Sequence, residues 1–199
     1  MAMNTVRLLL VAGFVCLSAA TASAADAEKG GKLVYACLGC HGSENYKNAY
    51  PKYSVPKLGG QNEAYIVAAL GQYAAGDRWH PTMQGYASTL TPDERADIAA
   101  FFNSAGKKVS GEKTAGEPPK KAEACVACHG QSGAGTMAEY PNIGGQHADY
   151  LAQALNDYRL GRRKNPIMAP FAQQLTRDDV EALARYFAKQ PGLVTPSLD

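Results

Sequence analysis

The feature that most constrains this chain is an internal repeat, in which two segments align without gaps at a constant offset of 85 residues. Segment 59–102 matches segment 144–187, both begin with Gly-Gly-Gln, and 17 of the 44 aligned positions are identical. Pro56 and Pro141 extend the match upstream at the same offset. A match of this length indicates two copies of one structural unit. We therefore expect two similar domains in tandem.

Each copy of the repeat is preceded by the same motif, two cysteines separated by two residues and followed at once by a histidine. Its members are Cys37, Cys40 and His41 in the first half and Cys125, Cys128 and His129 in the second. Cys-x-x-Cys-His is the attachment signature of haem c, in which the thiols bond to the vinyl groups and the histidine binds the iron. The sequence therefore predicts two covalently bound haem c groups, each with one histidine as an axial ligand.

Zinc binding and thiol redox chemistry are the other common uses of paired cysteines. A zinc ribbon brings together two clusters about 15 to 20 residues apart, whereas more than 80 residues separate these two. A thioredoxin-like motif lies in a βαβ context, and the sequence shows no convincing alternating strand pattern. The histidine after each second cysteine therefore favours haem.

Methionines supply the candidates for the second axial ligand of each iron. Met83 and Met168 occupy the same place in the repeat, in Pro-x-Met, on what we expect to be a loop between two helices. A thioether there would close over the haem face opposite the histidine. His80 is the rival ligand in the first half, but the second half has Asn165 at that position, which favours methionine. Met137 has no counterpart in the first half and is not expected to bind iron.

Two further pairs of residues are candidates for contacts around each haem. An imidazole that binds iron needs an acceptor at its other nitrogen, which orients the ring and raises its basicity. The carbonyls of Pro56 and Pro141, each shortly before Gly-Gly, suit this role. Arg78 and Arg163, related by the repeat, are candidates to neutralise haem propionates, although solvated loop arginines are equally common.

Helical signals in both copies predict an all-α fold. Apolar residues recur at helical spacing before Gly76 and Gly161, which are placed to end a helix. A second helix in each copy begins with a capping signal at Thr91 or Thr176, followed by acidic residues. Segment 104–121 is rich in Gly, Lys and Pro, so we expect it to be a linker.

The N-terminal segment has the pattern of a secretory signal, with an apolar run too short to span a bilayer and a small-residue cleavage site near Ala24. Because haem c is attached outside the cytoplasm, export agrees with the cysteine motifs and predicts a periplasmic protein. An uncleaved leader would instead give a peripheral membrane association.

The expected parts of the chain are a signal peptide (1–24), a first domain (25–103), a linker (104–121) and a second domain (122–199).

The charge balance and the predicted iron ligands restrict the function. The formal net charge of +2 excludes a nucleic-acid-binding protein that relies on bulk positive charge. A dihaem enzyme such as a peroxidase needs an iron with an accessible position, which two methionine-closed haems do not offer. We therefore expect an electron-transfer protein and not an enzyme.

These motifs together resemble those of the dihaem cytochrome c4 family over essentially the whole mature length. The resemblance implies two class I cytochrome c domains related by a pseudo-twofold axis, with haem propionates approaching at the interface. One departure is that the segment 117–121 runs almost directly into the second motif, so the first helix of the second domain is expected to be truncated.

The resemblance also implies a partner, a haem-copper terminal oxidase that receives the electrons. The expected donor is a quinol–cytochrome c reductase or a dehydrogenase, and each haem would carry one electron. The alternative is a dihaem subunit of a dehydrogenase complex of the flavocytochrome c type. Stable co-purification with a flavoprotein would distinguish that subunit from a free carrier.

Overall fold

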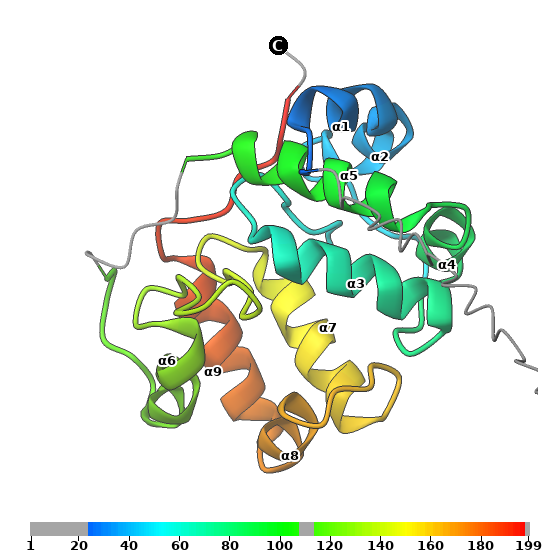
Figure 1. The fold of residues 1–199 in the computed structure, drawn as a ribbon. Helices are drawn as coiled ribbons and strands as arrows, with labels where there is room; N and C mark the ends of the chain where they lie inside the picture. Colours follow the sequence, from blue (N-terminus) through cyan, green and yellow to red (C-terminus); the bar gives the residue numbers. More distant parts are fainter. Residues whose placement is uncertain (1–23, 108–113, 198–199) are drawn as a thin grey trace, which may run out of the picture.

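The computed structural model describes residues 24–107 and 114–197 (Figure 1). The predicted signal peptide therefore lies outside the described residues except for Ala24. Within the described ranges the secondary structure is helical, apart from isolated bridges between single residues. None of the helices in these ranges has the length and apolar character needed to cross a membrane. The predicted all-α fold is confirmed.

The helices follow the repeat. The first half contains α1 (Ala27–Leu33), α2 (Tyr35–His41), α3 (Glu63–Ala75), α4 (Pro81–Ala87) and α5 (Pro92–Ser104). The second contains the 3₁₀ turn η1 (Lys120–Ala122), α6 (Glu123–His129), α7 (Ala148–Arg159), α8 (Met168–Gln173) and α9 (Arg177–Ala188). Helices α3, α4 and α5 thus correspond to α7, α8 and α9, and each cysteine motif lies on its own short helix, α2 or α6.

Each half has a core between its two longer helices. Helix α3 packs on α5, and α7 packs on α9 (Figure 1). Phe102 and Phe187, which are equivalent in the repeat, are almost fully buried in these two cores. Both α5 and α9 begin with the predicted capping box, in which Thr91 pairs with Glu94 and Thr176 pairs with Asp179. The two halves are therefore built by the same local rules.

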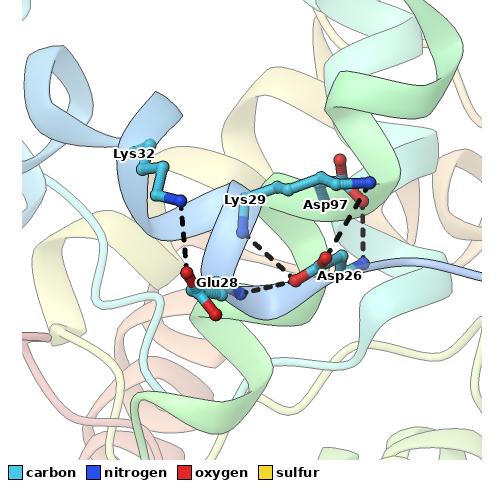
Figure 2. A network of polar contacts seen from close by, with 5 residues as sticks. All are labelled: Asp26, Glu28, Lys29, Lys32 and Asp97. Carbon is cyan, nitrogen blue, oxygen red and sulfur yellow. Dashed lines mark hydrogen bonds and ion pairs between the residues drawn. The ribbon is translucent and has the colours of Figure 1, made fainter.

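Helix α1 is the main difference between the halves. It packs closely against α5, and a Cβ placed on Gly30 would lie 2.0 Å from the carbonyl oxygen of Asp97. The Asp26 carboxylate caps α1, and its backbone N–H donates to the Asp97 carboxylate at 2.7 Å (Figure 2). In the second half only η1 precedes α6, so the expected truncation is present.

The two halves are related by a pseudo-twofold axis, which appears in reciprocal backbone hydrogen bonds. The N–H of Trp79 donates to the carbonyl of Arg162 at 2.9 Å, and the N–H of Lys164 donates to the carbonyl of Asp77 at 2.8 Å. These two bonds exchange places when the offset of 85 is applied. The expected pseudo-twofold arrangement of the halves is confirmed.

The C-terminal segment adds a second connection. After α9 the chain runs back to the first half, where Val194 and Gly59 exchange N–H to carbonyl hydrogen bonds of 3.0 and 3.1 Å. In Figure 1 this segment passes from the second half towards α5 and α1. Backbone hydrogen bonds therefore join the halves both at the pseudo-twofold axis and at the C-terminal segment.

Candidate functional site

The two cysteine motifs are presented on helices of seven residues each. All four of their cysteines are free thiols and are partly buried. Cys37 and Cys125 pack against the apolar core of their own half, and burial raises the pKa of both thiols. Two thiols on one short helix beside an apolar core suit covalent attachment of a large apolar group.

Both motif histidines are buried at the ends of their helices with one ring nitrogen already engaged. Nδ1 of His41 lies 2.9 Å from the carbonyl oxygen of Pro56, and Nδ1 of His129 lies 3.0 Å from that of Pro141. Burial lowers the pKa of His41 to about 4 and also lowers the pKa of His129. Each ring is therefore neutral, with Nδ1 as the donor and Nε2 as the nitrogen suited to bind a metal.

The two candidate methionines lie on short helices, so the expected loop position is wrong. Met83 is the third residue of α4, and Met168 is the first residue of α8. Pro81 opens α4 at a position where proline favours a helix start. Both methionines are partly buried, and Met83 packs against the apolar core of the first half.

Equivalent side-chain hydrogen bonds stabilise the beginning of these two segments. Nδ1 of His80 accepts a hydrogen bond from the Met83 N–H at 3.2 Å, and Oδ1 of Asn165 accepts one from the Met168 N–H at 2.9 Å. Nε2 of His80 is also engaged, 3.3 Å from Oδ1 of Asn48. This common role was not predicted from the sequence, although asparagine just before a proline favours the start of a turn.

Arg78 and Arg163 are buried where the halves meet, and an antiparallel bridge joins them. Each guanidinium donates to a phenol of the opposite half: Arg78 to Tyr150 at 2.5 Å and Arg163 to Tyr65 at 2.7 Å. Each also lies over a ring of its own half, at 4.4 Å above Tyr73 for Arg78 and 4.6 Å above Tyr158 for Arg163.

These two cations have no carboxylate partner among the described residues. The buried Nε of Arg163 has no hydrogen-bond partner in that part of the chain. Burial by itself would raise the pKa of Tyr65, but the adjacent Arg163 and Arg78 lower it below its usual value. Buried guanidiniums are normally neutralised by an anion. The unpaired Nε and the positive surroundings therefore fit carboxylates such as haem propionates.

Comparisons with known proteins agree with this geometry. The family model for Cytochrome c matches residues 27–106 and residues 120–190. Cytochrome c4 of Pseudomonas aeruginosa (strain PAO1) is 34% identical over 197 residues, which cover 91% of this chain and 95% of that protein. A protein of Stutzerimonas stutzeri (strain A1501) named thiosulfate dehydrogenase electron acceptor is 33% identical over 190 residues, covering 84% and 87%.

A solved structure has the same fold. The crystal structure of reduced recombinant cytochrome c4 from Pseudomonas stutzeri superposes with a TM-score of 0.67 at 31% identity, covering 84% of this chain and all of that one. The match over both halves agrees with two tandem haem domains and an electron-transfer role without enzyme activity. The chain belongs to the cytochrome c family, as a cytochrome c4-like electron carrier with two covalently bound haem c groups.

Proposed function

We propose that His41 with Met83, and His129 with Met168, are the axial ligands of the two irons in an exported electron carrier. When bound, haem c supplies reversible one-electron chemistry. The observation that carries the proposal is the matched geometry of the two histidines, each neutral, buried and held through Nδ1 by a proline carbonyl. The four motif cysteines would hold the two groups covalently.

The remaining site residues would tune and close each site. The carbonyls of Pro56 and Pro141 keep the imidazoles in one orientation and raise their basicity. Arg78 and Arg163 would bind propionates at the interface between the halves, where the guanidiniums donate to phenols and no carboxylate of residues 24–107 or 114–197 forms an ion pair with them. Helices α4 and α8 would bring a thioether to the open face of each haem and exclude small molecules from the iron, which suits a carrier.

The proposal includes export and the expected domain boundaries. The leader 1–24 would direct the chain to the periplasm and be removed near Ala24. The mature chain would then consist of a first domain (25–103), a linker (104–121) and a second domain (122–199). Both regions matched by the Cytochrome c family, 27–106 and 120–190, begin after the leader, which supports this division.

For partners, we propose a respiratory donor on one side and a haem-copper terminal oxidase on the other. The donor would be a quinol–cytochrome c reductase or a dehydrogenase. A dehydrogenase donor is supported by the relative named as the electron acceptor of thiosulfate dehydrogenase. The second candidate function is a dihaem electron-transfer subunit of a dehydrogenase complex, which would also receive its electrons from a dehydrogenase, as the name of that relative describes.

Rapid mixing tests the carrier function. The reduced protein should be oxidised quickly by membranes that contain a haem-copper oxidase in the presence of oxygen, and cyanide should abolish that oxidation. Carbon monoxide should not bind rapidly to the reduced protein, whereas Met83→Ala should bind one carbon monoxide per chain. Rapid binding to the unaltered protein would contradict methionine ligation and would favour an enzyme.

A further inference from the structure

Two buried glutamines join the halves by equivalent pairs of hydrogen bonds. The side-chain amide of Gln146 accepts from the N–H of Lys57 and donates to the Lys57 carbonyl, both at 2.9 Å. The side-chain amide of Gln61 accepts from the N–H of Asn142 at 2.8 Å and donates to the Asn142 carbonyl at 2.9 Å. Each glutamine thus pairs with the opposite half as a neighbouring strand would.

The peptide groups reached by these glutamines are the ones that hold the motif histidines. The N–H of Lys57 and the carbonyl of Pro56 belong to one peptide group, and that carbonyl accepts from Nδ1 of His41. A continuous path therefore runs from His41 through one peptide group to Gln146 in the other half. The second half repeats the path through His129, Pro141, Asn142 and Gln61.

A hydrogen bond at one end of a peptide group changes the other end. When the N–H donates to Oε1 of a glutamine, the peptide becomes more polarised and its carbonyl becomes a stronger acceptor. A stronger acceptor at Nδ1 makes the imidazole more basic and a better electron donor to a bound metal. Gln61 and Gln146 are 3% and 4% exposed. Little water can therefore replace these contacts, and burial strengthens the effect.

We propose that each glutamine is a positioning residue that lowers the reduction potential of the haem in the opposite half. Gln146 acts on the haem held by His41, and Gln61 acts on the haem held by His129. The inference rests on the proposed histidine ligation, and it adds a route by which each domain tunes its neighbour. A glutamine that only stabilised the contact between the halves would shift the reduction potentials of both haems by similar amounts.

The test compares Gln146→Leu with Gln61→Leu in the full-length protein with both haems. Each midpoint potential is followed in a redox titration by the NMR signal of its axial methionine methyl group, assigned beforehand with Met83→Leu and Met168→Leu. Gln146→Leu should raise the midpoint potential of the first haem and leave that of the second nearly unchanged. Gln61→Leu should show the reverse pattern.

Asn62→Ala provides a matched control at the same interface. Nδ2 of Asn62 donates to the carbonyl of Tyr140 at 2.6 Å, and Oδ1 of Asn62 accepts from the side-chain amide of Asn142 at 3.3 Å, so the Asn62 side chain joins the halves without contacting the peptide group of either path. This variant should shift neither potential selectively. A further variant, Gln146→Glu, keeps the side-chain length and gives a stronger acceptor, so it should lower the potential of the first haem more than that of the second.

Three results would overturn the inference: equal shifts of both haems, a shift only in the glutamine's own half, or no shift in any variant that binds two haems. Gln146→Glu keeps the test decisive if leucine prevents assembly. Failure of the underlying ligation is seen separately, because the unaltered protein would then lack one or both methionine methyl signals.

Discussion

Replacing Gly30 by alanine should destabilise the first domain, because there is no room for a side chain where α1 meets α5. The added Cβ would lie 2.0 Å from the Asp97 carbonyl oxygen and 3.0 Å from Cβ of Phe101. The carbonyl belongs to helix backbone and cannot rotate away, so α1 must move. Overpacking of this kind typically costs about 1–3 kcal/mol, and we expect the upper end of that range.

Part of that cost is offset by helix propensity, since alanine is favoured over glycine in a helix by about 1 kcal/mol. The expected net loss is therefore about 2 kcal/mol, or roughly a 30-fold decrease in the folding equilibrium constant. Gly31→Ala is the matched control. Its Cβ would meet only the Phe101 ring at 3.5 Å, an ordinary contact, so it should be neutral or stabilising by up to about 1 kcal/mol.

The assay is urea denaturation of the holoprotein, followed by fluorescence of Trp79, the single tryptophan, which lies in the first half. A bound haem quenches nearby tryptophan, so unfolding of that half raises the signal. With a slope of about 1–3 kcal/mol per molar urea, Gly30→Ala should lower the midpoint by roughly 0.7–2 M. Equal midpoints for Gly30→Ala and Gly31→Ala would refute the close helix contact.

Substitutions can also test the capping boxes of α5 and α9, the Asp149 carboxylate and the guanidinium of Arg163. Thr91→Ala should destabilise the first domain and Thr176→Ala the second, each by about 1 kcal/mol in denaturant titrations, because each removes the acceptor of a capping box. Burial would raise the pKa of Asp149, but hydrogen bonds from Ser54 and Tyr150 and the charge of Lys47 together lower this pKa below its usual value. Its contribution to stability is therefore complete above about pH 4 and lost as the pH falls through the lowered value, so thermal melts of Asp149→Asn should show less acid sensitivity than the unaltered protein. Arg163→Met should lower the midpoint potentials in a redox titration, because a buried positive charge disfavours the oxidised iron, and unchanged potentials would place this guanidinium away from both haems.

The repeat, the cysteine motifs and the capping signals were enough to predict the fold class, the tandem arrangement and the starts of α5 and α9. The capping boxes at Thr91 and Thr176 appear as predicted because their hydrogen bonds are local and need no tertiary contact. The predicted acceptors Pro56 and Pro141 do lie against the motif histidines. The role of each residue as an iron ligand stays a prediction.

Other features depend on contacts that a single sequence does not display. His80 caps α4, which carries Met83, and Asn165 holds the turn that leads into α8, which carries Met168. The pairing of Gln61 and Gln146 with the opposite half arises only when the two copies pack together. Their shared Gly-Gly-Gln context marked them as part of the repeat but gave no partner.

The most direct test of the central claim is the visible spectrum of the exported protein in both redox states, measured together with the haem content per chain. We expect two covalently bound haems per chain and a ferric methionine-to-iron charge-transfer band whose intensity corresponds to two methionine-ligated irons. A band corresponding to one iron, or a high-spin haem, would contradict ligation by Met83 or Met168. A single haem per chain would contradict the tandem arrangement of functional sites.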